Sequence, residues 1–129
     1  MTATPPMVRA LRGAITVDRD DPAEVRAATS EMLAALMQRN AVAIDDIISL
    51  MFTATQDLTS EFPAVAAREM GMNRVPLMCA AEIDVPGALP QCIRVMFHCY
   101  LPADRAPRHV YLRGARALRA DLADESDVQ

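Results

Sequence analysis

Alternating apolar and polar positions predict most of the strands of this chain. In residues 8–17, Leu11, Ile15 and Val17 share one face, and in residues 92–101 every second residue is apolar. A nearly continuous apolar run over residues 48–54 is typical of a central strand. The strands predicted in this way span residues 8–17, 48–54, 75–83, 92–101 and 108–112, with 115–118 extending or following the last one.

Two other segments have the spacing of helices. Asp21 is a candidate N-cap, Pro22 suits the first helical position, and Glu24 completes a pattern like a capping box. An apolar stripe then continues until the helix ends near Asn40. A second helix is predicted over residues 62–71, and a short helical turn over 44–46. This order of elements predicts an α+β fold, a mixed β-sheet with helices on one face.

The length and composition fit one folded domain. The chain has 129 residues, of which 52% are hydrophobic and 23% charged, as in a globular protein. We expect a single domain over residues 8–122, with flexible tails at 1–7 and 123–129.

Charge and residue usage exclude several classes of partner. The net charge of -4 and an aromatic content of 4% argue against a nucleic-acid-binding protein. No apolar run approaches the length of a membrane span, and the first residues lack the apolar core of a signal peptide. The three cysteines contain no C-x-x-C pair, so reduced thiols fit better than disulfides or a zinc site. We therefore expect a cytoplasmic protein with no membrane partner.

The common catalytic motifs are missing from the sequence. Neither a phosphate-binding loop nor a dinucleotide-binding glycine motif is present. His98 and His109 lack metal-ligand spacing, and Cys99 points to the opposite face of its strand from His98. Pairing of Cys79 with a histidine stays open, but a simply buried Cys79 is the favoured interpretation. No metal and no cofactor are expected.

Three charged residues stand out because they lie on strands otherwise built for burial. Arg12 lies among small residues, Glu82 shares a face with Met78 and Ala80 of the strand predicted over residues 75–83, and Arg94 has a fully apolar face behind it. Such charges must be paired or face a solvent-lined cleft. They form either ordinary ion pairs, with one another or with Asp57 or Asp84, or a cationic pocket for a small carboxylate-bearing anion, with Glu82 as an acceptor inside it.

Six stretches of the chain, in order and at compatible spacing, resemble one enzyme family. The stretches are Leu11–Val17, Thr53–Leu58, Phe62–Ala64 with Arg68–Glu69, Val75–Glu82, Cys92–Met96, and Arg108–Leu112 with Leu118–Arg119. Together they resemble the monofunctional chorismate mutases of the trimeric, barrel-like class. The resemblance runs from about Val8 to Leu122.

The resemblance implies the conversion of chorismate to prephenate, without a cofactor, in a homotrimer with active sites between adjacent subunits. It implies that Arg94 contacts the ether oxygen and a carboxylate of the substrate, and that Glu82 accepts a hydrogen bond from the substrate hydroxyl. Arg12 and Tyr111 would hold carboxylate oxygens. The residues that would line the cleft or its rim are Phe62, Ala64, Leu77, Met78, Cys79, Arg68, Leu118 and Arg119.

Two positions depart from the family pattern. Val65 stands where lysine is common after F-P-A, and Met78 stands where threonine is common. We expect these departures to change substrate affinity at most. Two alternatives stay open: an enzyme like the small trimeric imine deaminases, and a regulatory domain that binds a carboxylate without converting it.

Overall fold

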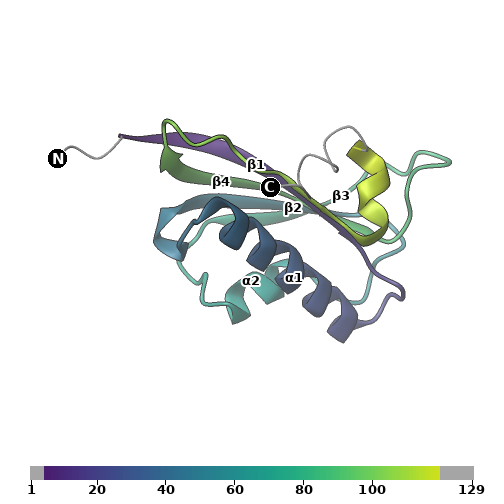
Figure 1. Ribbon diagram of the computed structural model, residues 1–129. Coiled ribbons are helices and arrows are strands. Elements are labelled where there is room, and N and C mark those ends of the chain that lie inside the picture. The colour runs from purple at the N-terminus through teal and green to yellow at the C-terminus, as the bar shows by residue number, and fades with distance from the viewer. Residues whose placement is uncertain (1–4, 120–129) are drawn as a thin grey trace.

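The computed structural model describes residues 5–119, which form a five-stranded sheet with both α-helices on one side (Figure 1). The helices are α1 (Pro22–Asn40) and α2 (Ala64–Glu69), and the strands are β1 (Pro6–Thr16), β2 (Ile47–Ala54), β3 (Leu77–Ala81), β4 (Cys92–Pro102) and β5 (Val110–Leu112). Two short 3₁₀ helices, η1 (Ile44–Asp46) and η2 (Arg113–Arg119), complete the described part. The predicted α+β class is confirmed.

The sheet is mixed, with strand order β3-β2-β4-β1-β5. The long strand β4 pairs antiparallel with β1 on one side and with β2 on the other. The two shorter strands then add in parallel at the edges, β5 beside β1 and β3 beside β2. α1 connects β1 to β2, which lie on either side of β4, and α2 connects β2 to its parallel neighbour β3. Both connections cross the sheet in the same direction, so both helices lie on the same face.

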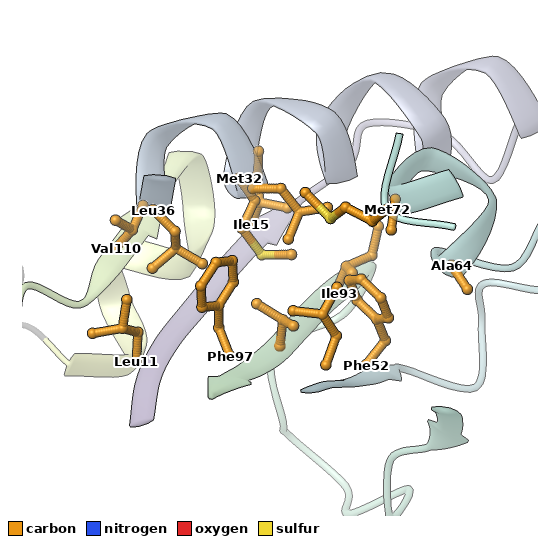
Figure 2. Close-up of a cluster of buried hydrophobic side chains, with 14 of the residues drawn as sticks. Leu11, Ile15, Met32, Leu36, Phe52, Ala64, Met72, Ile93, Phe97 and Val110 are labelled. Carbon is orange, nitrogen blue, oxygen red and sulfur yellow. The ribbon is translucent and has the colours of Figure 1, made fainter. Parts of the chain in front are cut away.

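The core lies between this face and α1 (Figure 2). Side chains alternate along β4, so that Ile93, Val95 and Phe97 are buried while Arg94 remains exposed on the other face. Met32 and Leu36 of α1 pack onto them from above. The face of the sheet away from the helices, which we call the open face, is therefore free to carry polar side chains.

The N-terminus of α1 is capped as predicted, but not by a full capping box. The Asp21 carboxylate accepts hydrogen bonds from the backbone N–H groups of Ala23 and Glu24, at 3.1 and 3.2 Å. The Glu24 carboxylate instead pairs with Arg19, at 2.6 Å. The helix ends at Asn40, where the following Ala41 adopts a left-handed conformation.

The predicted burial of one face of residues 75–83 is wrong. The strand is shorter than expected and lies at the edge of the sheet, so Cys79 and Ala81 are exposed and Ile83 is 84% exposed. An alternating apolar pattern does not distinguish a central strand from an edge strand whose outer side faces solvent or another chain.

Smaller differences concern the ends of the other elements. β1 begins at Pro6, so the last two residues of the expected tail, Pro6 and Met7, pair with Pro102 and Leu101 at the end of β4. Residues 115–118 belong to the 3₁₀ helix η2 rather than to a strand. The expected tail over 123–129 lies outside the described residues, and among residues 5–119 no helix combines the length and hydropathy that a membrane span requires.

Gly13 of β1 allows α1 to approach the sheet closely. A Cβ atom there would lie 2.8 Å from Leu36 Cδ1 and 3.0 Å from both Met32 Cγ and Val95 Cγ1. We expect Gly13→Ala to lower the free energy of unfolding by about 1–3 kcal/mol, as overpacking does in other cores. Urea unfolding measures this as a lower midpoint at unchanged slope. The exposed Ala27→Ser on α1 also adds one heavy atom and should change stability by less than about 0.5 kcal/mol. An unchanged midpoint for Gly13→Ala would contradict the close packing.

Candidate active site

A cleft of about 460 Å³ lies on the open face of the sheet, where β1, β2 and β4 run side by side. Its lining comes from four strands, from the residue that follows β3, and from η2. The lining residues are Arg12, Gly13, Met51, Thr53, Glu82, Arg94, Val95, Met96, Tyr111, Leu118 and Arg119. The structure thus brings together six of the residues singled out in the sequence, including all three of the unusual strand charges.

Arg94 and Glu82 form the central ion pair of the cleft. Arg94 Nε donates to Glu82 Oε2 at 2.8 Å, and Arg94 Nη2 donates to Glu82 Oε1. The hydrogen bonds with Arg94 hold the pKa of Glu82 below its usual value, and those with Glu82 raise the pKa of Arg94. Both groups are therefore charged throughout the neutral range.

This pairing orients Arg94 without consuming it. A guanidinium has five N–H groups in one plane, and Glu82 takes one from Nε and one from Nη2. The other N–H groups of Arg94 make no further hydrogen bond with the described residues, and half of the Arg94 side chain remains exposed. A fixed cation with free donors consequently faces the cleft.

Hydrogen bonds with β2 and the residues after it fix both the backbone and the carboxylate of Glu82. Its backbone N–H donates to Ala54 O at 2.9 Å, and its backbone oxygen accepts from Gln56 Nε2 at 3.1 Å. The Thr53 hydroxyl donates to the Glu82 carboxylate. Thr53 also stands opposite Arg94 in the register of β2 with β4, so one threonine borders both partners of the ion pair.

The register of the sheet places Arg12 and Tyr111 beside the ion pair. Arg94 lies opposite Ala14 of β1, and Ala14 in turn lies opposite Tyr111 of β5. The small Ala14 leaves room between these side chains. Arg12, two residues earlier on the same face, is exposed, and its guanidinium makes no ion pair within residues 5–119.

The end of β1 holds η2, which closes one side of the cleft. Gly114 N donates to Thr16 Oγ1 at 3.0 Å, and Arg113 Nη1 donates to Thr16 O at 3.2 Å. These contacts fix the helical turn that carries Leu118 and Arg119 into the lining. The lining contains three arginines and one glutamate, namely Arg12, Arg94, Arg119 and Glu82, so it has an excess of two positive charges, which suits a small dianion. We call this cleft the cationic cleft.

A second cleft, of about 520 Å³, lies beyond the ends of β2 and β3 and shares Thr53 with the first. Phe62, which is 69% exposed, and Cys79 both line it. We call this second cleft the edge cleft. The interpretation of Cys79 as a buried residue is therefore wrong, and no histidine is among the residues that line the edge cleft.

The remaining predicted site residues line neither of these two clefts. Leu77 and the 62%-exposed Met78 lie on the edge strand β3, and Arg68 is exposed on α2. Ala64 is 2% exposed in the core and offers no surface to a ligand within one chain. A role for these four residues stays a prediction that one chain does not test.

The other cysteines and the two histidines are not among the residues that line the cleft. Burial raises the pKa of both Cys92 and Cys99 to about 11, so these thiols remain protonated. His98 lies on the opposite face from Cys99, as strand alternation predicts, and its Nδ1 is 3.2 Å from Ser49 Oγ. Within residues 5–119, no group of three or more potential ligands among His, Cys, Asp and Glu is arranged to hold a metal ion.

Sequence reasoning missed five lining residues. Gly13, Met51, Thr53, Val95 and Met96 come from the strand segments that border Arg12 and Arg94. Thr53 carried a usable signal, because a hydroxyl in a nearly continuous apolar strand requires a hydrogen-bond partner.

Comparison with known proteins identifies the family of this chain. The sequence profile of chorismate mutase type I matches residues 8–122. The chain belongs to the chorismate mutase type I family. Its activity is accordingly that of a chorismate mutase, an isomerase of aromatic amino acid biosynthesis.

Individual chorismate mutases agree with this assignment. The chain is 50% identical to chorismate mutase AroH of Thermus thermophilus over 119 residues, which cover 90% of this chain and 97% of that protein. It is 41% identical to chorismate mutase AroH of Bacillus subtilis over 91% of this chain and 94% of that protein. A solved chorismate mutase from Clostridium thermocellum superposes with a TM-score of 0.80 at 46% identity, covering 84% of this chain and 98% of that one.

Family membership decides among the three functions left open by the sequence. A chorismate mutase is favoured over a deaminase and over a non-catalytic carboxylate-binding domain. The ion pair expected for the strand charges is present between Arg94 and Glu82, and the same pair lines a cleft with excess positive charge; carboxylate binding in that cleft stays a prediction.

Proposed function

We propose that the open-face cleft converts chorismate to prephenate, with Arg94 and Glu82 as the catalytic residues. The observation that carries this assignment is the oriented Arg94–Glu82 pair in a cleft with an excess of two positive charges. Chorismate carries two carboxylates, a hydroxyl and an enol ether. The charge of the lining therefore matches that of the substrate.

The reaction is a unimolecular rearrangement, so it needs no nucleophile and no proton transfer. The C–O bond of the ether breaks while a new C–C bond forms, and negative charge grows on the ether oxygen. Arg94 donates to that oxygen, and this interaction strengthens as the charge develops, which stabilises the transition state more than the substrate. Glu82 accepts a hydrogen bond from the ring hydroxyl and lies beside the ring, where positive charge develops.

Arg12 and Tyr111 supply the second requirement, which is conformational. In this proposal they hold substrate carboxylate oxygens, with Leu118 and Arg119 at the rim, and keep the flexible substrate in a folded, reactive chair. Fixing such a geometry contributes several kcal/mol in favourable cases. Arginine suits both tasks because its planar group stays charged and directs several donors.

We further propose that the enzyme is a homotrimer and that each active site lies between two subunits. Several large apolar side chains are exposed on the open face, which neither α1 nor α2 covers; these are Val8, Met51, Met78 and Tyr100. An apolar surface of this kind favours a subunit contact. Phe62 and Cys79 line the edge cleft rather than the cationic one, so a neighbouring subunit is needed to bring both sets of residues onto one substrate.

Subunit mixing tests the shared site. Arg94→Ala inactivates the cationic cleft, and Phe62→Asp places a negative charge on an exposed position of the edge cleft, where it repels a dianion. When equal amounts of the two variants are mixed, each site has about one chance in four of receiving an intact Arg94 from one subunit and an intact Phe62 from the other. The mixture should therefore recover about a quarter of wild-type activity. Light scattering should give three times the 14.1 kDa chain mass. Activity no higher than the mean of the two variants would place each site within one chain.

The proposed mechanism predicts a turnover number that is almost independent of pH. Because the pKa of Glu82 is lowered by Arg94 and that of Arg94 is raised, neither group changes charge near neutrality. We expect kcat, measured by loss of chorismate absorbance at saturating substrate, to stay flat across neutral pH. Activity falls only in acid, as the Glu82 carboxylate gains a proton below the usual glutamate range. A bell-shaped profile with two transitions near pH 7 would instead indicate acid–base catalysis.

A further inference from the structure

His109 joins two walls of the cationic cleft without lining it. It lies immediately before β5, and its ring Nδ1 is 2.9 Å from the backbone N of Arg12 on β1. A backbone N–H only donates, so Nδ1 must present a lone pair to it. This contact fixes the neutral ring of His109 in the form that carries its proton on Nε2.

The contact extends a very short strand pairing. β5 has three residues, and its parallel register with β1 begins at Val110 opposite Gly13. Arg12 precedes Gly13, the first residue of β1 that pairs with β5. Its backbone N–H therefore has no strand partner on β5, and the His109 ring accepts its hydrogen bond instead. The hydrogen bond to the imidazole of His109 therefore extends the pairing of β1 with β5 by one residue.

The chain before His109 is also anchored, which makes the ring a precise link. The side chain of Asn40, 1% exposed at the end of α1, accepts from Arg108 N at 2.8 Å and donates to Arg108 O at 2.9 Å. One neighbour of His109 is thus tied to the core. Its ring is tied to Arg12, and Tyr111 follows two residues later.

We propose that His109 is a positioning residue that fixes the backbone of Arg12 relative to Tyr111. This inference rests on the proposed function, in which these two residues hold substrate carboxylate oxygens. Because those contacts exist in the bound substrate and in the transition state alike, a loss of alignment raises KM more than it lowers kcat.

Three substitutions at this position separate hydrogen bonding from packing. Asparagine places an amide oxygen close to where Nδ1 stood, whereas glutamine carries its oxygen one bond further along the side chain. We expect His109→Ala and His109→Gln to raise KM by about three- to tenfold, the range for one lost hydrogen bond, with kcat changed less than about twofold. We expect His109→Asn to restore KM to within about twofold of wild type. If KM is unchanged in His109→Ala, or if His109→Asn is as impaired as His109→Ala, the proposal is wrong.

Arg12→Ala in the same assay distinguishes this failure from a failure of the proposed function. If Arg12→Ala leaves KM unchanged, the carboxylate-binding role of Arg12 fails. If Arg12→Ala raises KM and His109→Ala does not, only the positioning role fails.

Nitrogen-15 NMR of the imidazole gives a readout that does not depend on activity. In alkaline solution, where imidazoles are neutral, we expect the Nε2–H form of His109, with His98→Asn used to assign the signals. Observation of the Nδ1–H form would overturn the proposal, because that nitrogen could not then accept from Arg12.

Discussion

Arg94→Ala is expected to lower kcat by at least the ~10²–10³-fold typical of losing one preorganised donor to a developing oxyanion. The variant retains Arg12 and Arg119 in the lining, so the cleft still attracts a dianion. What it loses is the donor that meets the ether oxygen as charge grows there. The fall should therefore appear mainly in kcat, measured by loss of chorismate absorbance at saturating substrate.

Arg94→Lys tests whether geometry or charge matters. A lysine ammonium is a point charge that cannot bind both Glu82 oxygens side-on while presenting further coplanar donors. We expect this variant to be strongly impaired as well, although the net charge of the cleft is unchanged. A lysine variant with nearly wild-type turnover would show that a positive charge alone suffices.

Two controls protect this interpretation. Arg74→Ala removes an exposed arginine outside both clefts and should leave kcat unchanged. Half of the Arg94 side chain is exposed but only 16% of the Glu82 side chain is, so the thermal midpoint of Arg94→Ala is measured beside kcat to show that the variant is folded at the assay temperature. Near-wild-type turnover of a folded Arg94→Ala would remove Arg94 from the mechanism.

The sequence patterns that predicted the fold correctly were those in which local and tertiary preferences agree. The alternation of β4 was recognisable because both its neighbours are strands and one face is covered by α1, so apolar and polar positions separate cleanly. The cap and stripe of α1 were recognisable for the same reason. For β3 the pattern was the same but the burial was not, since its place at the sheet edge depends on strand order.

The site was predictable where a residue type contradicted its surroundings. Arg12 and Arg94 are charges on strands, Glu82 directly follows β3, and all three line the cationic cleft. Phe62 and Cys79 came from the family resemblance, and they line the edge cleft. The link from His109 to Arg12 spans 97 residues along the chain and depends on the parallel register of β5, which no local pattern encodes.

Asn40→Ala should cause the largest loss of stability, lowering the free energy of unfolding by roughly 2–4 kcal/mol, because it leaves buried polar groups without partners. The Asn40 side chain satisfies both backbone groups of Arg108 and also donates to Leu36 O at 2.8 Å. Alanine is the better helix former, so the backbone of α1 does not explain a loss.

Urea unfolding measures the change in stability of Asn40→Ala. As a control, Gln38→Ala removes an exposed amide from the same helix turn and should change stability by less than about 0.5 kcal/mol. Because Arg108 precedes His109, KM should also rise in the folded fraction of Asn40→Ala. Equal midpoints for the two variants would mean that solvent replaces Asn40 and that the segment before β5 is held by other contacts.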